Sequence, residues 1–292
     1  NTMGNKASGG KCRIVHREYK INNNGFKSQK AINGFVFNPG DELKYTAYTY
    51  IGELSIIDSP TGNQTYEFQY TGIPCPVAPT LTDIDGNTYN TVQIGEQCWM
   101  KENLKTTTYR NGTPIPNITD SLQWSTLTNG AYVWYDNDIS WKDLYGALYN
   151  WYAAIDTNRL CPTGWHVPGH DEWITLTDFI GGWISPYGDM LKSCRQVNSP
   201  LGGDCLTNEH PRWEAYGDYY GTDDFGFSGL PSGYRIIDDN TFILIGKVGF
   251  WWSSNEQSSN GAWLTGLLYN YDIVAHSYRH KNEGFSVRCL KD

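Results

Sequence analysis

Cysteine is the residue type in this chain whose number and spacing say most about its chemistry. The sequence has seven cysteines and no Cys-x-x-Cys pair: Cys12, Cys75, Cys98, Cys161, Cys194, Cys205 and Cys289. Zinc ribbons and thiol redox motifs use such close pairs, so this spacing favours disulfides formed in an oxidising compartment. We therefore expect an extracellular or cell-surface protein.

The expected disulfides, stated as a hypothesis, are Cys75 with Cys98, Cys161 with Cys289, and Cys194 with Cys205. The first and third close short local loops. The second ties the start of a predicted helical unit to the last predicted strand, and the chain-entropy model gives such a long loop about 4 to 5 kcal/mol of stabilisation. Cys12 is left over, which indicates a partner chain, a missing upstream half or a free thiol.

Histidine and aspartate offer weaker candidates for a metal site. His166 and His170 are close in sequence, but Pro168 between them prevents the helical geometry that would aim both rings at one metal. We expect these histidines to pack or to stabilise a turn. Calcium needs six to eight oxygen ligands, and the weak calcium candidates are Asp218, Asp223 and Asp224. No cofactor is expected, although calcium is left open.

The run Asp83 to Asn87 also resembles part of a calcium loop. Its glycine falls at the fourth position instead of the sixth, and no glutamate stands at the twelfth. A hairpin turn at Asp85 and Gly86 is the better interpretation.

Aromatic side chains are the remaining candidates for binding, because their faces stack on sugars and anchor protein interfaces. The candidates are Trp213, Tyr216, Tyr219, Tyr220, Trp251, Trp252 and Trp263. In an extended strand Trp251 and Trp252 point to opposite faces, so at least one is expected in the core. His276 and His280 alternate with Tyr278 on a predicted strand, which places all three on one face.

No catalytic arrangement is recognisable in the sequence. It contains no Ser/His/Asp arrangement, phosphate-binding loop or dinucleotide fingerprint. Arg288 is next to Cys289, but in a strand it points to the opposite face and so would not activate that thiol. We expect a protein that is not an enzyme.

One helix dominates the elements that would position these residues. Pro168 and Gly169 break the chain, Asp171 and Glu172 suit the positive end of a helix, and apolar residues then recur at helical spacing until Gly181 and Gly182. A second helix is expected over residues 144–153, capped by Ser140 or Asp138.

The N-terminal part has a different pattern. Short alternating segments at residues 43–50 and 54–57 lie between turns and predict strands of a small β-sandwich-like module. The Pro-rich connector at residues 72–79 marks the boundary. We expect a β-rich module at residues 1–74 and a second domain at residues 75–292.

Composition limits the function further. The net charge of −9 argues against nucleic acid as a partner, and no apolar run is long enough to span a bilayer. The first residue is Asn, so we expect the numbering to start at a processed end or fragment boundary. Candidate glycosylation sites are Asn63, Asn111, Asn117 and Ser121.

Several separated blocks resemble one known family. The chain is similar to the Fibrobacter major paralogous domain family in four segments. These are the stretch from Cys161 through Trp165 and Trp173 to Gly182, the blocks at residues 98–104 and 109–116, and the C-terminal run Gly284 to Cys289. The resemblance covers residues 80–292. It implies an α+β, C-type lectin-like fold, related to formylglycine-generating enzymes, with short twisted sheets and about two helices.

The resemblance also implies functions to be weighed. The Glu-Pro-Asn and Trp-Asn-Asp signatures of sugar-binding C-type lectins are missing, and the run Trp252 to Glu256 stands near the relevant region without matching. We expect a structural or adhesive surface protein that binds copies of itself or another surface protein. The alternatives are a glycan-binding module and, ranked last, a formylglycine-generating-type oxidase.

Overall fold

The structure is a computed structural model. It describes residues 12–14, 42–49, 52–59, 72–193, 213–214, 216–217, 219, 221–237 and 241–292. The chain divides into two compact units, Asn1–Tyr70 and Thr71–Asp292. The boundary expected from the sequence, between residues 74 and 75, lies close to this division.

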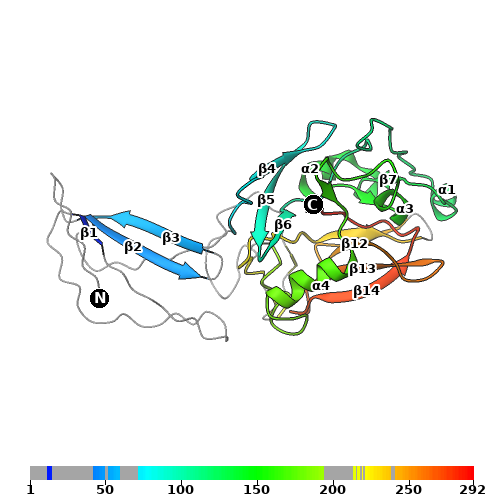
Figure 1. The fold of residues 1–292 in the computed structure, drawn as a ribbon. Helices are drawn as coiled ribbons and strands as arrows, with labels where there is room; N and C mark the ends of the chain where they lie inside the picture. Colours follow the sequence, from blue (N-terminus) through cyan, green and yellow to red (C-terminus); the bar gives the residue numbers. More distant parts are fainter. Residues whose placement is uncertain are drawn as a thin grey trace. The chain divides into compact units, whose positions relative to one another are not determined.

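The described residues of the first unit form a three-stranded sheet (Figure 1). Its strands are β1 (Cys12–Ile14), β2 (Glu42–Thr49) and β3 (Gly52–Asp58). β2 and β3 form an antiparallel hairpin, and β1 pairs with β2 in parallel. The hairpin occupies the two segments in which alternation predicted strands.

The second unit is a mixed α/β structure that is rich in sheet and has few helices. Its largest sheet has the strand order β4 (Thr80–Thr82), β5 (Thr88–Ile94), β6 (Gln97–Met100), β15 (Leu290–Lys291) and β9 (Trp165–His166). The last strand of the chain therefore lies between two earlier ones. This insertion brings Trp165 and His166 next to the last residues of the chain.

Three smaller sheets complete the strands. The largest of them contains β12 (Val248–Glu256), β13 (Gly261–Leu268) and β14 (Ala275–His280), all antiparallel. The two-stranded sheets pair β7 (Tyr132–Val133) with β8 (Leu148–Tyr149) and β10 (Ser232–Arg235) with β11 (Phe242–Ile245).

Helix α4 (His170–Phe179) is the longest described helix and follows the sequence prediction. Trp173 and Leu176 are buried on its inner face, and Gly181 and Gly182 end the run with φ of +119° and +126°. The helix packs against the sheet of β12, β13 and β14 (Figure 1). Trp173 lies 4.5 Å from Trp99 and 6.2 Å from Trp251 between ring centroids.

The helix predicted over residues 144–153 is wrong as a single element. The chain forms the short helices α2 (Lys142–Tyr145) and α3 (Trp151–Ala154), with β8 between them. Gly146 has φ of +76° and passes close to Asn103, so the helix ends there. Asp138 caps a 3-10 turn at Ile139–Trp141 instead, and the Asn150 side chain caps α3. The remaining helix, α1, spans Ser121–Ser125.

Two of the three expected disulfides are present. Cys75 is bonded to Cys98, and Cys161 is bonded to Cys289. All four cysteines are buried. The expected pair Cys194 with Cys205 lies outside the described residues.

Candidate binding site at helix α4

At the start of helix α4, backbone N–H groups donate hydrogen bonds to side chains of the protein itself. The Gly169 N–H donates to Glu172 Oε2 at 2.7 Å, and the His170 N–H donates to Asn255 Oδ1 at 2.6 Å. Asn255 comes from the end of β12, so the helix start is joined to the sheet. These two N–H groups are therefore already paired within the protein.

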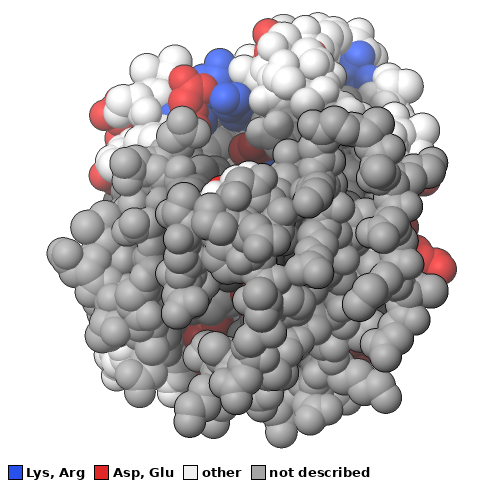
Figure 2. Space-filling model, turned by 90° about the vertical axis from the view of Figure 1, so that its left-hand side faces the viewer, with Lys and Arg blue, Asp and Glu red and all other residues white. Residues whose placement is uncertain are grey.

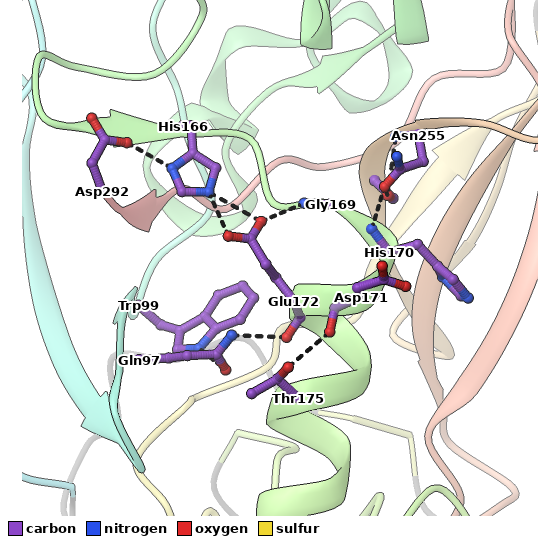
Figure 3. Close-up of polar contacts among 11 residues, drawn as sticks. Gln97, Trp99, His166, Gly169, His170, Asp171, Glu172, Thr175, Asn255 and Asp292 are labelled. Carbon is purple, nitrogen blue, oxygen red and sulfur yellow. Dashed lines mark hydrogen bonds and ion pairs between the residues drawn. The ribbon is translucent and has the colours of Figure 1, made fainter.

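His166 lies on one flank of this helix start, between two carboxylates (Figure 3). Its Nε2 is 2.9 and 3.0 Å from the two Glu172 oxygens, and its Nδ1 is 2.7 Å from Asp292 Oδ1. Gln97 also donates to the Glu172 backbone carbonyl. Both ring nitrogens are therefore engaged by carboxylates of the protein itself. The cluster joins β9, α4 and the C-terminal residue.

His170 projects from the opposite flank, away from His166 (Figure 3). Its ring stacks on Trp263, with centroids 4.4 Å apart and planes 21° from parallel, and Trp263 meets the edge of Tyr278 at 6.1 Å. Tyr278 is 54% exposed. We call His170, Trp263 and Tyr278 the aromatic platform.

His276 lies beneath this platform and holds α4 to the sheet. One ring nitrogen is 3.2 Å from Thr177 Oγ1 of α4, and the other is 3.2 Å from Thr265 Oγ1 of β13. Burial, with a smaller contribution from the neighbouring His170, lowers the pKa of His276 to about 4, while Asp178 opposes the shift. Burial also lowers the pKa of His170. Both imidazoles are therefore neutral at pH 7.

The loop after α4 presents apolar side chains to solvent. Trp183 is 58% exposed and Ile184 is 55% exposed. The backbone between them is fixed, because Val274 donates to the Trp183 carbonyl and Ser185 Oγ donates to Asp272 at 2.6 Å. We call residues 181–188 the apolar loop. A rigid loop with exposed apolar groups is typical of a protein contact.

Three of the aromatic residues expected to bind a ligand are buried instead. Trp251 and Trp252 have no exposed surface, because α4 covers one face of β12 and Phe285 covers the other. Their indole N–H groups donate to Asn103 Oδ1 and to the Tyr149 carbonyl. Trp213 is also buried and donates to the Gly229 carbonyl. These residues belong to the core, which removes them as contact residues.

Two other candidates lie together at a different place. Tyr216 and Tyr219 stack at 6.3 Å, and Tyr216 meets Tyr269 edge-on at 5.3 Å. Tyr216 is exposed. Tyr220 lies outside the described residues, and only Trp263 of the predicted set belongs to the aromatic platform.

The acidic candidates show no metal geometry within the described part of the chain. No group of three or more His, Cys, Asp or Glu there could hold a metal ion. The Asp223 carboxylate accepts from the Ser228 N–H and Oγ, and Asp224 follows it in the same turn. Asp218 lies outside the described residues. Asp83 accepts from the Asn87 N–H and from Tyr89 Oη inside the hairpin between β4 and β5, as the turn interpretation predicted.

The candidate glycosylation residues Asn111 and Asn117 are exposed, and Ser121 is partly exposed as the first residue of α1. Asn63 lies outside the described residues. On the face shown in Figure 2, the described acidic and basic side chains lie next to one another instead of forming a patch of one sign.

Fold and site together define a disulfide-tied, sheet-rich α/β domain with candidate contact surfaces at both ends of one helix. Residues 92–291 match the model of the Fibrobacter succinogenes major domain, and the chain belongs to that family. No curated protein and no solved structure matches the chain. None of the described helices has the length and hydropathy needed to cross a membrane.

Sequence reasoning missed several residues of the site. Asn255 and Asp292 act through contacts between segments far apart in sequence, and no local pattern announces such contacts. Glu172 was expected at the start of the helix, but its contact with His166 was not. The apolar loop did leave a signal: Trp183 and Ile184 stand between the breakers Gly181-Gly182 and Ser185-Pro186, beyond the end of the helical periodicity.

Proposed function

We propose that the chain is a secreted or cell-surface, non-enzymatic adhesive protein that binds a protein partner through the apolar loop, the simplest partner being a second copy of itself. The observation that carries the proposal is the exposure of Trp183 and Ile184 on a backbone fixed by hydrogen bonds. A fixed loop loses little entropy on binding, so its exposed apolar area contributes more of its free energy to association.

The two disulfides support an oxidising location. They also count against the oxidase alternative, because Cys161 and Cys289 are buried and bonded to each other. A reactive cysteine needs exposure and nearby positive charge. The Arg288 guanidinium contacts Asn103 and the Ser228 carbonyl, on the other side of the strand from Cys289.

We also propose that the second unit has a C-type lectin-like fold. Support comes from the last strand, which returns to lie between β6 and β9, and from the disulfide that ties this strand to the start of the helical unit. An experimental structure, superposed on C-type lectin domains, tests this assignment.

Sedimentation velocity of the full chain over a wide concentration range tests the adhesive function. We expect a species that grows with concentration in the wild type and is lost in the double variant Trp183→Ser, Ile184→Ser. Leu122→Ser is the matched control, since Leu122 is 75% exposed on α1, outside the apolar loop. A wild-type chain that stays monomeric throughout would count against self-association.

A further inference from the structure

The aromatic platform is part of a mixed surface on strands β13 and β14. In the register of this pair, Trp263 lies opposite Tyr278 and Gly261 lies opposite His280. Side chains two residues apart on a strand share a face, and so do directly opposed residues. Two aromatic rings, an imidazole and the gap left by a glycine therefore share one side of the sheet.

The central ring of this surface is held in place before any ligand arrives. His170 covers one face of the Trp263 indole, and the His170 backbone is itself bound to Asn255. Tyr278 contacts the Trp263 ring in an edge-on arrangement. A ring fixed in this way loses little conformational freedom when something stacks against it.

Hydrogen-bonding groups lie directly beside the aromatic platform. A Cβ placed on Gly261 would lie 3.0 Å from Ser258 Oγ and 3.5 Å from Gln257 Oε1, so a hydroxyl and an amide lie at Gly261, two residues from Trp263 on the same strand. His280 Nδ1 accepts from the Asn282 N–H at 3.3 Å, which leaves its Nε2 as the donor. These three groups carry donors and acceptors that hydroxyl-rich molecules use.

From this arrangement we infer that the aromatic platform, together with Gln257, Ser258 and His280, binds a neutral saccharide chain. A pyranose ring has one face of C–H groups, which suits the negative face of an indole, and an edge of hydroxyls, which suits amide, hydroxyl and imidazole groups. The imidazoles of His170 and His276 are neutral, so these two rings add no charge that would favour an acidic sugar.

A protein partner fits this surface less well than it fits the apolar loop. Protein interfaces need on the order of 1,000 Å² with a dry apolar centre. Here the aromatic rings are flanked by Gly261 and bordered by polar side chains. The saccharide site therefore lies at the N-terminal end of α4 and is independent of the proposed protein contact at its C-terminal end.

Titration of the full chain with cellohexaose, xylohexaose and mannohexaose, followed by tryptophan fluorescence and calorimetry, tests the inference. We expect at least one of the three to bind with Kd below about 1 mM, and Trp263→Ala to weaken that binding at least about tenfold. Trp263→Phe should retain part of the affinity. Tyr278→Ala, at a mostly exposed position, should weaken binding several-fold without affecting folding.

Trp183→Ala is the matched control, because it removes an exposed indole from the apolar loop and should leave saccharide affinity unchanged. Thermal unfolding of each variant confirms that it is folded. If none of the three hexasaccharides binds at concentrations up to about 10 mM, or if folded Trp263→Ala and Tyr278→Ala bind like the wild type, the inference is wrong. Sedimentation of the same samples reports self-association separately, so either proposal can fail alone.

Discussion

At the scale of single residues, His276 makes stability depend on pH. Its ring is neutral in the fold because burial lowers its pKa to about 4 from the usual 6.5. Between these two pH values the unfolded chain binds more protons than the folded chain, so stability rises with pH. The fold therefore loses on the order of 1–3 kcal/mol as pH falls from 6.5 to 4, after allowing for the solvent that reaches the ring.

The variant His276→Gln should flatten this part of the profile, since glutamine keeps a donor and an acceptor near Thr177 and Thr265 without titrating. Urea unfolding at a series of pH values measures the slope. The same slope in variant and wild type would show that another group is responsible.

Asp223 produces the opposite dependence. The residue is partly exposed, but its carboxylate is buried, and this burial raises its pKa to about 7 against the opposing hydrogen bonds from Ser228. The folded chain holds the proton between pH 3.8 and about 7, so stability falls as pH rises through this window. We expect Asp223→Asn to be more stable than the wild type at pH 7 by on the order of 2 kcal/mol.

Asparagine suits this position because Asp223 has φ of +50°, a conformation that asparagine tolerates well. The gain should become small near pH 4 and vanish below 3.8, where the aspartate is protonated in both states. A gain that is equal at pH 4 and pH 7 would contradict the assignment to this carboxyl group. Ser228→Ala is the complementary variant. It removes the hydroxyl that donates to the Asp223 carboxylate, so it should raise the pKa of Asp223 further.

The sequence could not reveal these environments. Alternation along an extended chain correctly predicts that the side chains of Arg288 and Cys289 point to opposite faces. It does not show that the Arg288 guanidinium is buried against Phe227 and hydrogen-bonded to Asn103, which lies far away in sequence. The same applies to Trp251 and Trp252. The sequence predicted that these two side chains point to opposite faces of the strand, but the segments that bury them on each face are distant in sequence.

At the scale of elements, the start of α4 depends on Glu172. Its side chain satisfies the Gly169 N–H and also contacts His166. We expect Glu172→Ala to destabilise the second unit by about 1–2 kcal/mol. Urea unfolding followed by tryptophan fluorescence measures this loss, because all 12 tryptophans lie at or beyond residue 99.

Asp171→Ala is the matched control for this variant. Asp171 is an exposed carboxylate in the same helical turn and interacts with the helix dipole, a contribution of about 0.3–1 kcal/mol. Equal losses in the two variants would mean that the Gly169 and His166 contacts of Glu172 add nothing beyond charge at the helix start.

The local spacing of apolar residues predicted secondary structure well where one periodicity continues through the whole segment. The spacing of Trp173 and Leu176 between Pro168 and the two glycines predicted α4 closely. Residues 144–153 carry aromatic residues that suit a helix, but Gly146 passes against Asn103 and leads into β8. The close approach of a remote segment overrode local propensity there.

At the scale of the whole molecule, the two disulfides among the described residues constrain loops of very different length. Cys161 and Cys289 are 128 residues apart, whereas Cys75 and Cys98 are 23 apart. Both pairs were predicted from the sequence. The former joins the residues just before β9 and β15, so it ties together the two neighbouring strands at one edge of the largest sheet.

The loop lengths predict unequal losses when each disulfide is replaced by two serines. In the chain-entropy model the bridge between Cys161 and Cys289 stabilises by about 5 kcal/mol and the bridge between Cys75 and Cys98 by about 3 kcal/mol. The double variant Cys161→Ser, Cys289→Ser should therefore have a lower urea midpoint than Cys75→Ser, Cys98→Ser, with tryptophan fluorescence reporting on the second unit. Because all four positions are buried, each serine adds a similar polar penalty, and the difference between the variants isolates the loop. A larger loss for the short loop would show that native packing around Cys75 and Cys98, instead of unfolded-state entropy, determines how much each bridge stabilises the fold.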